Sequence, residues 1–281
     1  MTIKIVTDST ADLPPALAEE LGITVVPLYV LFGHENYRDR VDITEDQFYQ
    51  RLLNGPIHPS TSQPTPQDFT DTYHRLSQQA DGIISIHISS KLSGTYNSAL
   101  QAKEIVSAEC SVEVVDSEMV SMGLGLLAIE AATIANSGKS LQQVVEEVKQ
   151  SIRNTRLWAL FDTLKYLALG GRIGKAKALV GTILNIKPIL AVKEGEMVPV
   201  SQARTRAKGI DMLYEYVNTV TDIQDLSVIY TTTPDEADVL ADRIGAKFNR
   251  SRIKLARIGS AIGVHAGPGA LAVALRGKER N

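Results

Sequence analysis

The clearest hydrophobic pattern in the chain is an isoleucine-rich run that passes into a segment of helical periodicity. The β-branched positions of this run are Ile83, Ile84, Ile86 and Ile88. Such a run has the length and composition of a buried strand. Apolar residues then recur at helical spacing over residues 99–106. The pattern therefore predicts a strand that leads into a helix through a polar turn at residues 89–93.

Strand, polar segment and helix follow one another along much of the remaining chain, as is typical of α/β proteins with largely parallel sheets. Residues 23–32 predict a strand that Pro27 interrupts and thereby places near an edge or a bend. The length of 281 residues favours two domains. We expect a boundary near residues 153–156, which divides the chain into 1–155 and 156–281. Other strand-like runs lie at residues 3–6, 112–115, 157–161, 226–230 and 253–258.

The polar turn after the isoleucine-rich strand is a candidate anion site. Ser93, Gly94 and Thr95 stand where the next helix begins. Free backbone N–H groups and the positive end of the helix dipole favour a negative group at such a position. In parallel α/β sheets these loops lie at the carboxyl ends of the strands, where ligands bind. The alternative is that Ser93 or Thr95 only caps its own helix.

A second polar segment, residues 60–63, precedes another predicted helix. Thr65 is expected to cap that helix, with Pro66 at its first position. The hydroxyls of residues 60–62 have no capping role, and two prolines stiffen the segment. We expect a polar loop here, which either recognises a small polar group or is a solvated connector; the residues alone leave both open.

Composition narrows the classes of protein to be considered. The chain has 29 basic and 32 acidic residues, a net charge of −3, so no global field favours nucleic acid or anionic lipid. Cys110 is the only cysteine, which excludes a disulfide framework and fits a reducing compartment. The first residues run into a strand rather than a leader peptide, and the most apolar stretch, residues 122–135, is shorter than a bilayer span. These features predict a cytoplasmic protein.

Common catalytic and cofactor motifs are missing from the sequence. It has no phosphate-binding loop ending in Gly-Lys-Ser/Thr, and its five histidines show no metal-ligand spacing. Residues 123–128 fit a dinucleotide fingerprint only formally, because they follow no strand. Ser93 and His265 could meet as nucleophile and base, but no nucleophile elbow surrounds Ser93. The polar residues that follow the predicted strands therefore indicate binding rather than catalysis.

Several segments together resemble one family, the DegV family of bacterial fatty-acid-binding proteins, which includes the acyl-carrier subunit of fatty acid kinase. The resemblance runs from residue 3 to about residue 275. Because the matching segments occur in the same order, it is far more specific than any one of them. They lie at residues 7–13, 61–64, 90–96, 116–117, 167–173, 187–189 and 265–269.

The resemblance implies a fold and a binding site. It implies two α/β domains, the first with three layers and a mainly parallel sheet, the second with two layers and a mixed sheet, and a ligand tunnel between them. Thr61, Ser93 and His265 would then surround the carboxylate of one long-chain fatty acid, such as palmitate or oleate. Ser62 and Gly94 would be secondary binding positions. No cofactor, metal or catalytic residue is expected.

The resemblance also implies a partner. A separate ATP-dependent kinase subunit would convert the bound acid to an acyl-phosphate, in lipid transport or fatty acid metabolism. Arg172 and Arg204 match positions expected at that contact, whereas loop arginines commonly belong only to the solvated surface. A transient membrane contact is possible, and no nucleic acid is expected. The alternatives are a hydrolase that uses Ser93 and His265, a small-molecule kinase related to dihydroxyacetone kinase, or a regulator that reports ligand occupancy.

Overall fold

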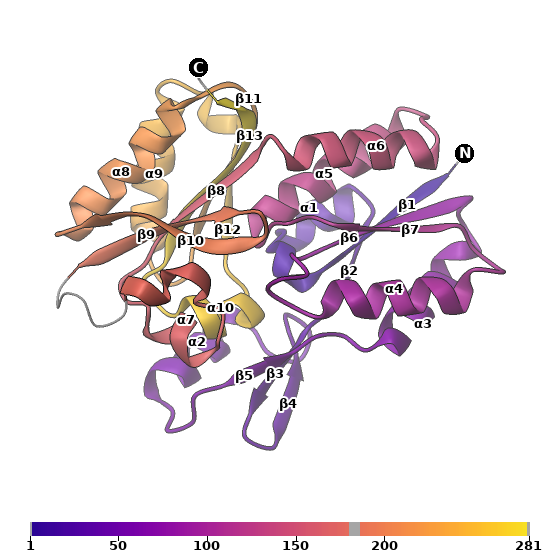
Figure 1. The fold of residues 1–281 in the computed structure, drawn as a ribbon, viewed down its shortest axis with the longest axis horizontal. Helices are drawn as coiled ribbons and strands as arrows, with labels where there is room; N and C mark the ends of the chain where they lie inside the picture. The colour runs from indigo at the N-terminus through magenta and orange to yellow at the C-terminus, as the bar shows by residue number, and fades with distance from the viewer. Residues whose placement is uncertain (1, 180–185, 280–281) are drawn as a thin grey trace.

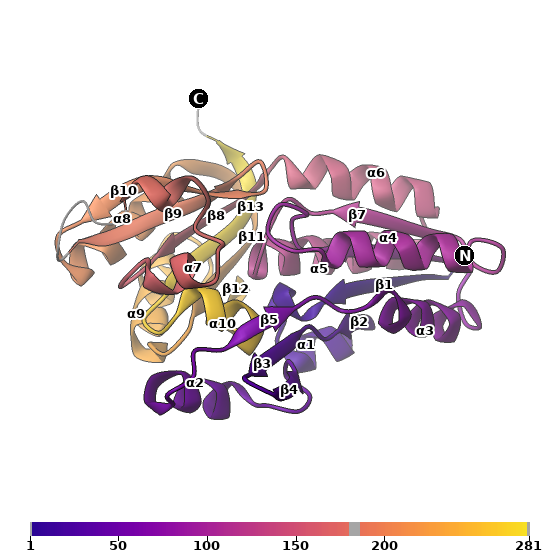
Figure 2. The same cartoon turned by 60° about the horizontal axis from the view of Figure 1, so that its bottom comes forward.

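The first lobe is built on a parallel sheet with the strand order β2-β1-β6-β7. The computed structural model describes residues 2–179 and 186–279. Helices α5 (Met122–Asn136) and α6 (Leu141–Ile152) cover one face of this sheet, and α3 (Pro66–Ser77) and α4 (Thr95–Val106) cover the other (Figures 1 and 2). The predicted three-layer lobe is therefore confirmed. Its strands are β1 (Ile3–Asp8), β2 (Ile23–Val26), β6 (Gly82–His87) and β7 (Val112–Asp116).

Alternating side chains explain why this sheet is covered on both faces. Ile5 and Ile84 pack with α5 and α6, whereas Val6 and Ile83 pack with α3 and α4. Successive residues of a strand point to opposite faces, so a run of consecutive isoleucines fits a strand buried on both sides. Thr65 caps α3 and Pro66 is its first residue, as expected.

An excursion from the first lobe, residues 28–62, forms a small sheet of its own with the order β4-β3-β5. The prediction of a single strand over residues 23–32 is wrong: Pro27 separates β2 from β3 (Tyr29–Phe32), and the two strands belong to different sheets. The predicted loop at residues 60–63 is wrong in part, because β5 (Ser60–Ser62) pairs with β3. The excursion also contains β4 (Glu35–Arg38) and α2 (Glu45–Asn54), which begins at a capping box on Thr44.

The second lobe is a mixed sheet with the order β10-β9-β8-β13-β11-β12, covered on one face by α8 (Arg206–Asn218) and α9 (Pro234–Gly245). Trp158 and Leu160 of β8 pack toward these helices, whereas Leu157, Ala159 and Phe161 face the first lobe. Thus the predicted two-layer lobe with a mixed sheet is confirmed. Its strands are β8 (Thr155–Leu160), β9 (Lys187–Lys193), β10 (Glu196–Ala203), β11 (Val220–Tyr230), β12 (Ile253–Arg257) and β13 (Leu271–Glu279).

Short helices complete the structure around the junction of the lobes. The excursion packs against α10 (Ser260–Ala266), since Phe48 and Val264 belong to one apolar cluster (Figure 2). Residues of the predicted first domain thus contact both lobes. Because the division of the chain does not follow from this packing alone, the domain boundary after residue 155 stays a prediction. The other short helices are α1 (Pro15–Glu20), α7 (Lys165–Leu169) and the 3-10 turns Ser9–Ala11, Gly174–Leu179 and Arg250–Arg252.

Two buried polar contacts join the lobes. Arg276 of β13 pairs with Glu130 of α5 and, at 2.6 Å, with Asp225 of β11. Near the excursion, Asp12 accepts hydrogen bonds from the N–H of Gly259 at 2.8 Å and from Arg40 at 3.3 Å. Burial raises the pKa of Asp12 to about 7 despite the nearby Arg40. Both contacts join the first lobe to the second.

Candidate functional site

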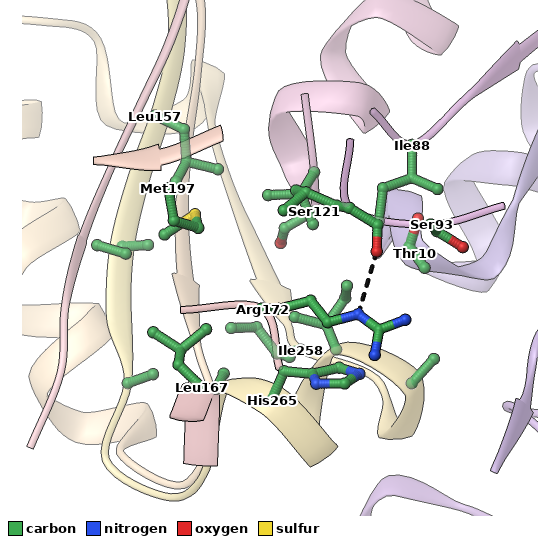
Figure 3. Close-up of a pocket in the computed structure, with 18 of the residues that line it drawn as sticks. Thr10, Ile88, Ser93, Ser121, Leu157, Leu167, Arg172, Met197, Ile258 and His265 are labelled. Carbon is green, nitrogen blue, oxygen red and sulfur yellow. Dashed lines mark hydrogen bonds between the residues drawn. The ribbon is translucent and has the colours of Figure 1, made fainter. Parts of the chain in front are cut away.

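A cavity lies between the two lobes, and the empty space at this site, with open solvent included, is about 800 Å³. Ile88 and Val120 line it from the first lobe, and Leu157, Phe161, Met197 and Ala272 line it from the second. Ser93, Arg172 and His265 lie on one side of this space, whereas Leu157 and Met197 lie on the other (Figure 3). The cavity is therefore a largely apolar space with polar groups gathered on one side.

Ser93 reaches the cavity from the turn between β6 and α4. Its Oγ shares a hydrogen bond of 2.8 Å with Oγ1 of Thr95 and accepts the N–H of Thr95 at 3.3 Å. Gly94 stands at the N-cap position of α4 and supplies no side chain. Ser93 thus accepts a backbone N–H at the start of its own helix and still lines the cavity. Capping and ligand binding therefore do not exclude each other.

Thr61 reaches the cavity from β5, where it stands opposite Val30. Its Oγ1 lies 2.9 Å from Nε2 of His265 in α10. The strand alternation turns the neighbouring Ser60 and Ser62 to the outside, where both are exposed. The structure therefore brings Thr61 and His265 together and leaves Ser62 outside the cavity lining.

His265 is neutral at ordinary pH. Burial, with the nearby positive charge of Arg172 as the next cause, lowers the pKa of His265 to about 4. Its Nδ1 is buried without a hydrogen-bond partner in the described chain, and a Cβ on Gly170 would lie 2.0 Å from that atom. A glycine at position 170 is thus the condition for the ring to occupy its place.

The surroundings of His265 decide which atom donates in the hydrogen bond between Thr61 Oγ1 and His265 Nε2. A buried N–H without an acceptor is rarer and costlier than an unused lone pair. The proton of the neutral ring is therefore assigned to Nε2, which donates to Thr61 Oγ1. The hydroxyl hydrogen of Thr61 then remains free to donate to an acceptor in the cavity. This arrangement suits an anionic oxygen.

Arg172 lines the cavity from the second lobe, on the same side as Ser93 and His265 (Figure 3). Its Nε donates to the carbonyl of Leu92 at 3.2 Å, and its Nη1 donates to the carbonyl of Gly170 at 2.7 Å. The side chain is therefore fixed beside the polar end of the cavity. Arg204, the other arginine expected at a partner contact, is exposed in the turn before α8 and does not line the cavity.

Two polar residues that line the cavity, Thr10 and Ser121, had no predicted role. Thr10 follows β1, and its side chain is held by the carboxylate of Asp8. Ser121 lines the cavity with a backbone φ of 54° and donates through Oγ to Asp12 at 2.6 Å. The position of Thr10 at the carboxyl end of a strand was the signal that could have found it. Ser121 precedes an apolar helix and carries no local signal.

The arrangement does not favour a hydrolase built on Ser93 and His265. The Nε2 atom of His265 is engaged by Thr61, and its Nδ1 faces Gly170 rather than an orienting carboxylate. A chain of Ser85, His87 and Asp8 does occur, with distances of 2.7 and 2.9 Å. All three side chains are fully buried inside the first lobe, so a substrate cannot reach them. This chain joins β1 to β6 instead.

Two further properties concern the described residues as a whole. Over residues 2–179 and 186–279, no three histidine, cysteine, aspartate or glutamate side chains are grouped so that they could hold a metal ion. Within the same ranges, no helix has both the length and the apolar character required to cross a bilayer.

Comparison with known proteins decides the family. The model of the DegV family, described as "Uncharacterised protein, DegV family", matches residues 2–278. The chain belongs to the DegV family. A DegV domain-containing protein from Deinococcus radiodurans is 39% identical over 280 residues, covering 98% of each chain. The predicted family is confirmed.

Solved DegV structures share the fold. A DegV family protein from Thermus thermophilus, described as fatty-acid binding, is 34% identical with a TM-score of 0.92, covering 99% of this chain and 100% of the other. The fatty-acid-binding DegV of Bacillus subtilis is 32% identical with a TM-score of 0.89, covering 99% and 100%. A stearic-acid-binding protein from Eubacterium ventriosum is 29% identical with a TM-score of 0.88, covering 98% of both chains. All three of these similar structures are thus described as fatty-acid-binding proteins.

Proposed function

We propose that this protein binds one long-chain fatty acid, such as palmitate or oleate, with its carboxylate at Thr61, Ser93 and His265. The observation that carries the proposal is the hydrogen bond between Thr61 and His265 at the polar side of an otherwise apolar cavity. It leaves the Thr61 hydroxyl free to donate to the carboxylate. The fatty acids described for the DegV relatives support the same ligand class.

The head group and the tail contribute differently. A carboxylate removed from water must be matched by donors, and the hydroxyls of Thr61 and Ser93 are such donors. The tail supplies most of the affinity: burying about fifteen methylenes at roughly 0.8 kcal/mol each contributes on the order of 12 kcal/mol before the costs of association. Leu157, Phe161 and Met197 offer apolar contacts for it.

In this proposal the protein is a carrier without chemistry of its own. A separate ATP-dependent kinase subunit in the cytoplasm phosphorylates the presented carboxylate to an acyl-phosphate, for lipid transport or fatty acid metabolism. Arg172 is exposed and lines the cavity, and Arg204 is exposed on the second lobe, so both can meet a phosphate-bearing partner. A transient membrane contact would supply the lipid.

Mass spectrometry of an organic extract tests the proposal. Protein purified from a bacterial host should release a C14 to C18 fatty acid, and adding palmitate or oleate to the delipidated protein should raise its melting temperature. Addition of the purified kinase subunit and ATP should then yield acyl-phosphate. A lipid-free extract together with an unchanged melting temperature would contradict fatty-acid binding. Hydrolysis of a p-nitrophenyl ester would favour the hydrolase instead.

A further inference from the structure

The turn that carries Ser93 is organised around a different, fully buried hydroxyl residue, Ser89. The Ser89 carbonyl accepts the N–H groups of Leu92 at 2.9 Å and Ser93 at 3.1 Å. Its own N–H donates to the carbonyl of Met119, and its Oγ accepts the N–H of Lys91 at 3.2 Å. The position of Ser93 thus depends on the position of Ser89.

Ser89 is in turn held by the second lobe. Its Oγ donates to the carbonyl of Gly195 at 2.8 Å. Gly195 lies in the turn between β9 and β10, with a φ of +77°, and a Cβ added there would lie 2.4 Å from Ser89 Oγ. The glycine therefore permits both the turn and the close approach of the second lobe to the first.

A second contact fixes the same turn three residues later. The carbonyl of Leu92 accepts a hydrogen bond from Nε of Arg172, which belongs to the second lobe. The N–H of Leu92 is bonded to Ser89 within the turn. The second lobe thus bonds to both ends of the segment that places Ser93 beside the cavity.

We propose that Ser89 is a positioning residue through which the contact between the lobes sets the recognition of the carboxylate. The inference rests on the fatty-acid binding proposed above and adds a residue outside the cavity lining. With the lobes together, the contact of Ser89 with Gly195 holds the Ser93 hydroxyl where the carboxylate needs a donor. Without this contact and that of Arg172 with Leu92, nothing in the second lobe holds the turn that carries the donor. Selection for an acid over a neutral lipid therefore depends on a contact outside the cavity lining.

The test compares two ligands that differ only at the head group, palmitate and methyl palmitate, by displacement of a fluorescent acyl probe. In Ser89→Ala the affinity for palmitate should fall about tenfold, the loss typical of a hydrogen bond to a charged group. The affinity for the ester should change less than about twofold. The control Ser90→Ala, an exposed serine in the same turn, should leave both affinities unchanged. Retained ester binding also reports that the cavity is folded.

Two additional variants separate positioning from a general structural effect. In Ser89→Ala combined with Ser93→Ala, the losses should not add, because Ser89 acts through Ser93. Gly195→Ala, which alters the same contact from the second lobe, should also lower the preference for the acid. If the wild type prefers the acid, two results would overturn the inference about Ser89 and leave the proposed function standing. One is additive losses in the double variant, and the other is an unchanged ratio of acid affinity to ester affinity in Ser89→Ala. A wild-type protein that does not prefer the acid would contradict the proposed head-group site as well.

Discussion

The Thr61 hydroxyl lies 2.9 Å from Nε2 of His265, 204 positions later in the chain. Thr61 belongs to the excursion from the first lobe, and His265 to α10 of the second. The two meet because the excursion packs on α10 through an apolar cluster that includes Phe48 and Val264. The polar side of the cavity is therefore assembled by the same packing that joins the excursion to the second lobe.

Replacing Thr61 with valine tests the role of its hydroxyl. The substitution keeps the β-branched shape that fits β5 but removes the hydroxyl that we propose as a donor to the carboxylate. We expect palmitate binding to weaken by about 1–3 kcal/mol, measured by isothermal titration calorimetry. Ser62→Ala, one residue away on the exposed face of the same strand, is the matched control and should bind as the wild type does. Equal losses in both variants would place the head group elsewhere.

Gly170→Ala tests the position of the His265 ring. Position 170 has a φ of −79°, which alanine adopts readily, but the new Cβ would lie 2.0 Å from Nδ1 of His265. The ring must move away from Thr61, and we expect a loss of about 1–2 kcal/mol in palmitate affinity.

The adjacent glycine provides the contrast. At Gly171 a Cβ would contact nothing, but the φ of +70° strains any other residue. Gly171→Ala should therefore lower the free energy of unfolding by about 1–2 kcal/mol and leave the preference for acid over methyl ester intact. Wild-type affinity in Gly170→Ala would show that the His265 ring does not need its present place.

His265 makes stability depend on pH in a defined direction. Its folded pKa, about 4, lies below the ordinary value of 6.5, so the unfolded chain binds the proton more tightly. The stabilising contribution of neutral His265 is present above about pH 6.5 and is lost as the pH falls through 4. The difference in unfolding free energy between wild type and His265→Gln should change by on the order of 3 kcal/mol at most between pH 7 and 4.

Urea unfolding of both proteins across this pH range measures that difference. The comparison with a variant is necessary because Asp12, whose pKa burial raises to about 7, acts with the opposite sign and cancels only when both proteins retain it. Parallel stability curves for the two proteins would contradict a depressed pKa at His265.

Filling the apolar side of the cavity should change the length of chain that fits. Ala272 of β13 is buried and lines the cavity. Ala272→Leu adds three carbon atoms there, and each methylene displaced from the cavity costs about 0.8 kcal/mol of affinity. We expect palmitate to bind at least about tenfold more weakly and laurate to be affected much less. A uniform loss over a C10 to C18 series of acids would contradict a tail that extends along β13.

The helices and strands that could be predicted from the sequence are those with a clear periodic pattern of apolar side chains. The isoleucines from Ile83 to Ile88 and the polar turn after them indicated a strand, a turn and a helix in the right places. Ser93 is a candidate on the same local grounds, because it lies in the turn between a strand and a helix. The small sheet was missed because its pairing of Val30 with Thr61 joins segments whose local composition suggests a bend and a loop.

The rest of the site depends on contacts between distant segments. Thr61 and His265 were candidates through the family resemblance, since no local pattern indicates that they touch. Nothing near Ser89 distinguishes it from Ser90, and only the approach of Gly195 from the second lobe gives it a role. Arg172 is expected at a partner contact, and its hydrogen bond to Leu92 of the first lobe appears only in the folded chain.

A crystal structure of the palmitate complex tests the central claim most directly. The account predicts one palmitate between the lobes, with a carboxylate oxygen within hydrogen-bond distance of the hydroxyls of Thr61 and Ser93 and with its tail against Leu157 and Met197. A palmitate bound outside this cavity, or bound in it with the carboxylate at the Leu157 side, would contradict the account.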